Sequence, residues 1–306
     1  MKNIRFLALA LVLCLFLCAC SDSKTAIAPN ISTEVFISEE NTQAIEPTTD
    51  KTEPTVPETT AVPDMNTRLI ETEAQYAALQ DKLMNDSFLT QADMNGLAGQ
   101  QYTLWDNLLN ELWAELTHTL PENQMQQLLQ EERAWIRWKE HSVALAANYY
   151  DGGSLSILAA NSRAAKLTQN RVYELAGILS SGVYPIPQTE NSLYHQVFLP
   201  LASDQLPSLE NLQLLLEFRG LSFTEEEGIL QIQDPSFPET AVYGSLSNES
   251  GAVTISQLIY SFAEDTTQKC VRVDFVPTPP TFYIDASVWD GGTEVATIEE
   301  ITDYLS

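Results

Sequence analysis

Residues 119–153 read TLPENQMQQLLQEERAWIRWKEHSVALAANYYDGG, and this stretch decides the fold class of the region around it. Thr119 followed by Glu122 has the spacing of a capping box, which predicts that a helix begins here. Apolar residues then recur at helical spacing on one face: Met125, Leu128, Leu129, Trp135, Ile136, Val143 and Ala146. Asp151-Gly152-Gly153 predicts the end of the helix, because glycine adopts the positive φ that closes a helix without strain. Such an amphipathic helix must bury its apolar face against other elements.

The same helical pattern extends on both sides of this stretch. A first helix is expected over residues 67–85, and Thr90 with Asp93 forms a second capping box at the start of another. A last helix is expected over residues 154–179, because apolar residues again follow the helical period. Short connections between long helices favour antiparallel neighbours, so residues 67–182 predict an all-α antiparallel helical bundle.

Residues 188–306 change in character after the break at Pro185 and Pro187. A short amphipathic helix over residues 208–218 is followed by strand-like runs, a turn at Asp290-Gly291-Gly292 and a final helix. The runs are Ile229–Ile232, Ala241–Leu246, Ile255–Phe262, Cys270–Val276 and Phe282–Trp289. The predicted fold class is therefore multidomain, with a helical bundle followed by a small, acidic α+β domain of no family that we recognise.

The chain begins with MKNIRFLALALVLCLFLCAC, residues 1–20, which has a basic start and an apolar run too short to span a bilayer comfortably. These are the proportions of a signal peptide. Leu17-Cys18-Ala19-Cys20 resembles a bacterial lipobox, and that resemblance implies that Cys20 becomes the lipidated first residue of the mature chain. The alternative is an ordinary secretory signal cut after Ala19, which would leave the thiol of Cys20 free.

Residues 21–66 are rich in Thr, Pro and Glu and have no amphipathic period, so they predict a disordered spacer. A lipid on Cys20 followed by such a spacer predicts a protein anchored to the extracytoplasmic face of the bacterial cell membrane. After signal cleavage and lipidation, Cys270 is the cysteine that is left, so an intramolecular disulfide is not expected. Its alternating context indicates a buried strand residue, and a reactive thiol is the alternative.

The composition excludes several classes of function. Acidic residues number 42 against 15 basic ones, and the formal net charge of −27 is unsuited to binding nucleic acid. The 3 His and 4 Cys are scattered, and no metalloprotease, nucleotide-binding or nucleophile-elbow motif is present. The sequence therefore predicts a protein that is not an enzyme and that uses no metal or cofactor.

Four pieces of the helical region share the order and spacing of a known family. They are Asp93-Met94-Asn95, the run Glu132–Glu140, Gly152-Gly153-Ser154 and the Thr168-x-x-Arg171-x-x-x-Leu175 pattern. Together they resemble the lysozyme inhibitor LprI-like N-terminal domain over about residues 84–179. The resemblance implies that the motif positions are either the skeleton of the fold or an interaction site: Met94, Asn95, Arg133, Trp135, Lys139, Glu140, Gly152, Gly153, Ser154, Thr168 and Arg171.

Most of these positions also have a purely structural interpretation. Trp135 is expected in the core, and Arg133 could pair with a glutamate on an adjacent helix instead of touching a partner. Gly152 and Gly153 supply the positive φ of a helix stop, and Ser154 is predicted to cap the helix that follows. We therefore interpret the motif mainly as the skeleton of a fold, with an interaction site as the alternative.

The chain departs from the family pattern at two places. Leu97 and Val143 stand where the family has cysteines, which implies a lost crosslink worth on the order of 2–4 kcal/mol and a retained apolar contact. Lys139-Glu140 replaces an Arg-Asp pair, so the charge order is kept but the planar, bidentate guanidinium is lost.

The main functional hypothesis is an envelope lipoprotein that binds a macromolecular partner and inhibits lysozyme. Lysozymes are commonly basic, so an acidic exported protein would attract them or another basic envelope protein. The alternatives are a structural or assembly module of the envelope and a ligand-binding lipoprotein, neither of which would inhibit lysozyme.

Overall fold

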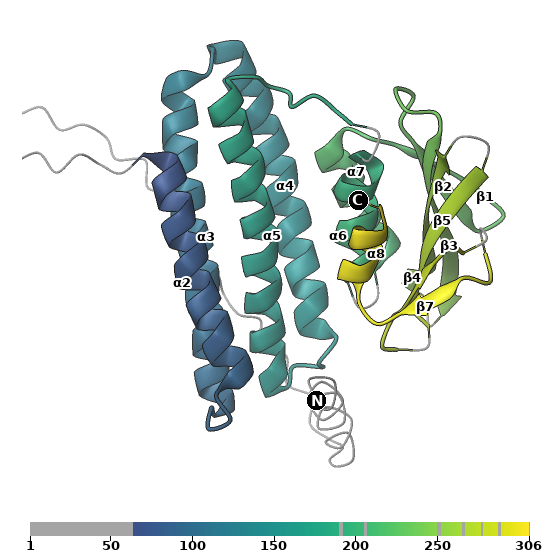
Figure 1. The fold of residues 1–306 in the computed structure, drawn as a ribbon, viewed down its shortest axis with the longest axis horizontal. Coiled ribbons are helices and arrows are strands. Elements are labelled where there is room, and N and C mark those ends of the chain that lie inside the picture. Colours follow the sequence, from purple (N-terminus) through teal and green to yellow (C-terminus); the bar gives the residue numbers. More distant parts are fainter. Residues whose placement is uncertain are drawn as a thin grey trace, which may run out of the picture. The chain divides into compact units, whose positions relative to one another are not determined.

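The computed structural model describes residues 64–189, 192–204, 207–249, 252–264, 267–276, 278–286 and 289–305. The predicted signal peptide, Cys20 and nearly all of the predicted spacer lie outside these ranges. The described residues belong to one unit, which contains a bundle of long helices and an antiparallel sheet (Figure 1). Within these ranges, every helix is too short or too polar to cross a membrane.

The predicted helical region is confirmed. Helix α2 packs on α3, α3 packs on α5, and α5 packs on α4 (Figure 1). The bounds of these helices are α2 Met65–Asn85, α3 Gln91–Thr119, α4 Glu122–Asn148 and α5 Ser154–Ser181. Helix α2 begins slightly earlier than predicted because the side chain of Asp64 caps it, accepting a hydrogen bond from the amide of Thr67 at 2.9 Å.

One predicted capping box is confirmed and the other is wrong. Thr90 and Asp93 form a reciprocal box at the start of α3, with each side chain bonded to the amide of the other residue. Thr119, in contrast, is still helical, and its hydroxyl donates to the carbonyl of Glu115. Pro121 occupies the cap position of α4, and because its ring has no hydrogen-bond acceptor, no side chain caps this helix.

The chain then enters a second group of helices. The predicted short helix is confirmed as α7 (Leu209–Arg219), which is capped by the hydroxyl of Ser208 and closed by Gly220 at φ 65°. The final helix is α8 (Ile298–Leu305). A π-helix, η1 (Tyr194–Phe198), and α6 (Leu199–Ala202) were not predicted.

Seven strands form one sheet in the order β1-β2-β3-β4-β5-β6-β7, with every neighbouring pair antiparallel. The strands are β1 Phe223–Glu226, β2 Ile229–Gln233, β3 Thr240–Glu249, β4 Ala252–Glu264, β5 Thr267–Asp274, β6 Thr281–Ile284 and β7 Thr293–Val295. This sheet with its helices confirms the α+β class. Strands β1 and β7 were not predicted, and β6 ends at Ile284 instead of continuing to Trp289. Gly291 and Gly292 adopt positive φ in the β6–β7 connection.

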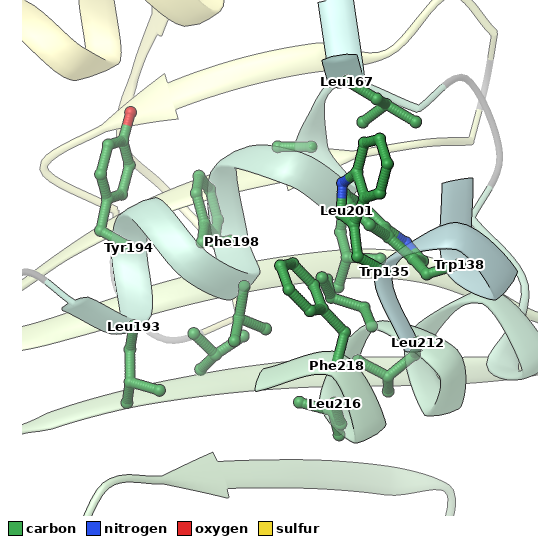
Figure 2. Packing of buried hydrophobic residues seen from close by; sticks show 14 of the residues in the cluster. Trp135, Trp138, Leu167, Leu193, Tyr194, Phe198, Leu201, Leu212, Leu216 and Phe218 are labelled. Atoms are coloured by element: carbon green, nitrogen blue, oxygen red, sulfur yellow. The ribbon is translucent and has the colours of Figure 1, made fainter. Parts of the chain in front are cut away.

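One hydrophobic cluster joins the bundle to the sheet. It includes Trp135 and Trp138 of α4, Phe218 of α7 and Leu258 of β4, all buried. Figure 2 shows how the side chains of the two tryptophans and of Phe218 gather with those of Leu201 and Leu212. Helix α7 contacts both α4 and β4, so it links the two parts of the fold.

Cys270 lies on the other face of the sheet, in a small separate cluster with Ile259 and Ala286. Its side chain is 2% exposed, which confirms the prediction of a buried strand residue. Burial raises the pKa of the thiol, although a hydrogen bond with Ser261 opposes the shift. A buried thiol of raised pKa is a poor nucleophile, so the alternative of a reactive Cys270 is not supported.

Candidate functional site

Arg171, one of the family-motif positions, lies at the centre of a buried ion cluster. The row of α5 that carries Leu167 and Leu175 also carries Arg171, so the apolar face of the helix brings the guanidinium inward. Its side chain is 1% exposed and pairs with Glu132 at 2.8 Å, Glu131 at 2.6 Å and Glu174 at 2.9 Å. Arg171 therefore ties α5 to α4 through charged groups in the core.

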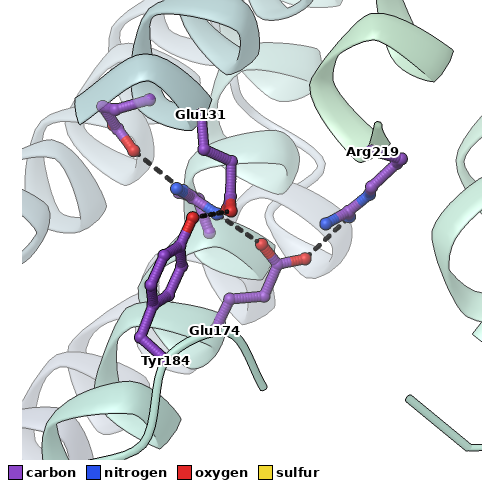
Figure 3. Close-up of polar contacts among 6 residues, drawn as sticks. Glu131, Glu174, Tyr184 and Arg219 are labelled. Carbon is purple, nitrogen blue, oxygen red and sulfur yellow. Dashed lines mark hydrogen bonds and ion pairs between the residues drawn. The ribbon is translucent and has the colours of Figure 1, made fainter. Parts of the chain in front are cut away.

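Two further residues extend this Arg171 cluster towards the second half of the chain. Arg219, at the end of α7, pairs with Glu174 at 2.7 Å, and the hydroxyl of Tyr184 donates to Glu131 at 2.7 Å. Figure 3 shows Tyr184 and Arg219 on either side of Glu131 and Glu174. The cluster thus joins α4 and α5 to α7 and to the segment that follows α5.

The pKa values in the Arg171 cluster follow from burial and charge. Burial alone would lower the pKa of Arg171, but Glu132, Glu174 and Glu131 more than offset it, so this pKa lies above its ordinary value. Burial raises the pKa of Glu132, and Arg171 offsets this only in part. Burial also acts on Glu174, but Arg219 and Arg171 outweigh it and lower that pKa. All these groups are engaged with one another, as expected of a structural cluster.

Aromatic rings surround the same cluster. Phe218 stacks on Trp138 with ring centroids 5.8 Å apart, and the guanidinium groups of Arg219 and Arg171 lie 4.0 and 5.1 Å from the Phe218 ring. Trp135 is 2% exposed, which confirms it as a core residue. Trp138 and Phe218 therefore supply the apolar part of the α4–α7 contact, and the Arg171 cluster supplies the polar part.

Lys139 lies about two turns after Glu132 on the same face of α4, against Tyr102 of α3. Its ammonium lies 4.8 Å from the ring of Trp135 and 5.5 Å from that of Tyr102, which are cation–π distances. Burial lowers the pKa of Lys139, and the nearby carboxylates of Asp106, Glu140 and Glu132 do not fully offset it. Burial and Asp106 raise the pKa of Tyr102 to about 12. The residue that replaces the family's arginine is thus engaged within the fold.

A second buried ion cluster, which sequence reasoning missed, is centred on Arg163. Its guanidinium pairs with Asp204 at 2.6 Å and donates to Ser142 at 3.0 Å and to the carbonyl of Pro200 at 3.1 Å. Asp204 also accepts from Asn211 of α7 at 2.6 Å. The available signal was the position of Arg163, which lies on the same row of α5 as Leu167 and Arg171. The partners were not predictable, because they come from distant segments.

Other motif positions hold the end of the bundle where α3 and α5 begin. The side chain of Asn95 donates to the carbonyl of Ser154 at 3.3 Å, and Asn161 donates to the carbonyl of Asn95 at 3.3 Å. Met94 is half-buried on the same turn of α3. The start of α3 is therefore bonded to the start of α5, which brings two pieces of the family motif together.

The Gly152-Gly153-Ser154 turn differs in two details from the prediction. Gly152 has φ 73°, as expected for a helix stop, but Gly153 has φ −65°, so the prediction of a positive φ there is wrong. Gly153 also occupies the cap position of α5, and Ser154 is the first helical residue. The prediction of Ser154 as the cap is wrong. A cap position at Gly153 provides no side-chain acceptor, so the turn relies on backbone hydrogen bonds such as that from the Gly153 amide to the carbonyl of Tyr150 at 2.9 Å.

The remaining motif positions divide between surface and core. Arg133 and Glu140 are exposed on α4, whereas Thr168 is fully buried on α5. The structure does not bring Arg133 into the Arg171 cluster, and within the described residues it forms no ion pair. Leu97 is 6% exposed and Val143 is half-buried, so both positions are apolar and at least partly covered. Their mutual contact stays a prediction.

An open cavity of about 390 Å³ lies between α4 and the end of α7, and Glu131 and Arg219 of the Arg171 cluster are among the residues that line it. The charged residues that line it already have partners of opposite charge: Glu131 pairs with Arg171, Arg219 with Glu174, and Arg137 with Glu217. In the ranges that the structure describes, no three His, Cys, Asp or Glu side chains gather as metal ligands would. The cavity is therefore a gap at the contact between α4 and α7, and its charged residues are engaged with the protein itself.

The loop that connects α2 to α3 differs from this cavity because it carries an exposed aromatic side chain. Phe88 is 93% exposed there, although the neighbouring residues are well ordered by hydrogen bonds. The carboxylate of Asp86 accepts from the amide of Phe88 at 3.0 Å, and the Thr90–Asp93 box follows directly. An exposed aromatic ring on a well-held loop was not among the residues that the sequence singled out.

Comparison with known families identifies the helical segment. No curated protein and no solved structure matches the chain significantly. The family described as "Lysozyme inhibitor LprI" matches residues 84–175, which run from the end of α2 to the row of α5 that carries Arg171 and Leu175. The expected resemblance is thereby confirmed: residues 84–175 of this chain form an LprI-type segment, similar to a family of inhibitors and not of enzymes.

Proposed function

We propose that this protein is a lysozyme inhibitor of the bacterial cell envelope. The observation that carries the proposal is the match of residues 84–175 to the LprI family. The segment is folded throughout: the helices α3 and α4 and most of α5 lie within it, and most of its motif residues are either packed in the core or hold the end of the bundle. It offers a rigid, preorganised surface, which is what an inhibitor that works by binding requires.

Charge supports the choice of partner. The chain carries a formal net charge of −27, and lysozymes are commonly basic, so long-range attraction would raise their rate of association. Attraction of this kind weakens as salt screens the charges, over about 10 Å at 0.1 M ionic strength. Binding should therefore depend strongly on the salt concentration.

We further propose that the protein acts as a lipoprotein at the extracytoplasmic face of the membrane. The supporting observation is the lipobox-like Leu17-Cys18-Ala19-Cys20, followed by the Thr-, Pro- and Glu-rich residues 21–66. Two or three acyl chains on Cys20 would anchor the protein firmly, whereas one chain binds only marginally. Cys20→Ser should abolish labelling by radioactive fatty acid and release the protein from the membrane fraction. Unchanged labelling of the variant would contradict this anchor.

The inhibition itself is testable with residues 60–306, the compact unit to which all described residues belong. The measurement is the rate at which a basic lysozyme hydrolyses cell walls, at low and at physiological salt, with increasing amounts of this protein. We expect inhibition at both salt concentrations, with weaker affinity at the higher one. An equally basic protein without lysozyme activity, added as a competitor, shows how much of the binding is charge alone. Failure to inhibit at either salt concentration would contradict the proposal.

A further inference from the structure

We infer that the end of the bundle formed by the α2–α3 and α4–α5 turns is the surface on which a basic protein docks. We call this surface the bundle end, and define it as residues 81–95 and 149–157. The inference rests on the proposed function and adds to it the place of contact. Figure 1 shows that both turns lie at the same end of the helices.

The bundle end carries several exposed apolar side chains. Phe88 is 93% exposed, Ile157 55%, Met84 49% and Tyr149 44%. A nearly fully exposed phenylalanine is costly to leave in water, since an aromatic ring of this kind buries 150–250 Å² when it is covered. Exposed apolar patches on soluble proteins commonly mark interaction sites. Phe88 is thus well placed to be the central anchor of an interface.

The anchor is held in place. The amide of Asp86 donates to the carbonyl of Lys82 at 3.1 Å, which closes α2. The amide of Phe88 then donates to the Asp86 carboxylate at 3.0 Å, and Thr90 starts α3 through its capping box. Because the loop is fixed before any partner arrives, little conformational entropy would be lost on binding.

The two turns of the bundle end are also fixed to each other. Asn95 donates to the carbonyl of Ser154 at 3.3 Å, so the first turns of α3 and α5 are joined beside the exposed loops. The rings of Tyr149 and Tyr150 meet edge to face with centroids 5.2 Å apart, which stiffens the second turn. Asn95 therefore holds the two turns of this surface together, whereas Gly152, Gly153 and Ser154 are exposed and form part of it.

The charges of the bundle end indicate which kind of protein binds there. The same two segments carry Asp81, Asp86, Asp93 and Asp151, against the single basic residue Lys82. All four carboxylates are on exposed residues. Acidic groups around an apolar anchor are complementary to an apolar pocket bordered by Lys and Arg, which is the chemistry of a basic protein. The α4–α7 cavity, whose charges are already paired, lacks this complementarity.

The first test is Phe88→Ala in the full chain. Since the side chain is 93% exposed, its removal should leave the folded structure intact, which thermal unfolding would verify. We expect the affinity for a basic lysozyme to fall at least tenfold, as for an anchor at the centre of an interface. The matched control is Val276→Ala, an exposed apolar residue (61%) after β5, which should leave the affinity unchanged.

The second test removes charge without changing shape. Asp86→Asn keeps an oxygen that accepts from the Phe88 amide, and Asp151→Asn keeps a residue that tolerates φ 49°. The double variant should lower the association rate several-fold at low salt and much less at high salt.

The outcomes separate the two proposals. If the unaltered protein inhibits lysozyme and Phe88→Ala inhibits equally well, the docking surface is wrong and the proposed function stands. If the unaltered protein neither binds nor inhibits lysozyme, the proposed function fails, and the docking surface fails with it. Loss of inhibition in Phe88→Ala, with Val276→Ala unaffected, supports both.

Discussion

The α4–α5 side of the LprI-type segment and the bundle end use the family-motif residues in different ways. On the α4–α5 side, Arg171 and Trp135 are buried and connect the segment to α7 and the sheet. At the bundle end, Asn95 and Gly152 hold turns whose neighbours are exposed. One motif therefore has two tasks: its buried residues hold the fold together, and its residues at the bundle end position a surface.

The largest loss of stability is expected where a substitution disrupts the buried residues that hold the fold together. Arg171→Met leaves Glu131, Glu132 and Glu174 without their shared partner in a largely buried place. Removing one member of a buried ion pair costs about 3–5 kcal/mol, so we expect a loss of this size in the free energy of unfolding. Urea denaturation measures it.

Arg133→Met is the matched control, because Arg133 belongs to the same motif but is exposed on α4. Its unfolding free energy should change by no more than about 0.5 kcal/mol. If the two variants lost similar stability, the division of the motif into a buried and an exposed part would be mistaken.

A smaller effect distinguishes two carboxylates within the Arg171 cluster. The pKa of Glu174 lies below the ordinary value of 4.5, so its stabilisation is present above that value and is lost as the pH falls through the lowered pKa. Glu174→Gln should therefore cost about 1.5–3 kcal/mol at neutral pH, the range for hydrogen bonds to charged groups, and progressively less in acid.

Glu132→Gln is the companion variant, and the pH dependence of its effect on stability should have the opposite sign. The pKa of Glu132 is raised, so the folded state keeps its proton to higher pH than the unfolded state does. The stability that Glu132 contributes through this raised pKa is fully present below pH 4.5, the ordinary pKa of glutamate, and is lost as the pH rises through the raised value. Unfolding in urea between about pH 3 and pH 7 should show the cost of the two variants moving in opposite directions. Parallel curves would show that the two carboxylates share one environment.

Local patterns in the sequence predicted the elements of this fold better than their connections. The helical period gave the long helices, and alternation gave the central strands, since both follow from which side chains must be buried. The short strands β1 and β7 and the π-helix η1 were missed because such short segments have no distinct period. The motif positions were named through the family resemblance, and their part in an interaction stays a prediction.

The buried ion clusters could not be predicted in the same way. Arg171 reaches Glu132 across 39 positions, and Arg163 reaches Pro200 across 37. Periodicity places both arginines on the inner face of α5, but it cannot name partners that only the packed helices bring within reach. Phe88 was not predicted either, because the sequence does not show whether a single apolar residue in a short loop is buried or exposed.

The smallest expected effect compares two threonines that have the same sequence signal. Thr90→Ala removes the cap of α3 and should cost about 1 kcal/mol, because it leaves a helix amide without its acceptor. Thr119→Ala should change stability by no more than about 0.5 kcal/mol, because Thr119 ends α3 without capping α4. Thermal unfolding of the two variants measures these losses of stability. Equal losses would contradict the assignment of Thr90, and not Thr119, as a helix cap.

Thr90→Ala also links this small loss of stability to the bundle end. The Thr90–Asp93 box begins two residues after Phe88, so its removal should loosen the loop while leaving the aromatic ring in place. Lysozyme binding should then weaken less than in Phe88→Ala, and mainly through the entropy of a loop that is no longer preorganised. If binding were unchanged, the rigidity of the loop would have no part in recognition, and the exposed ring alone would account for the contact.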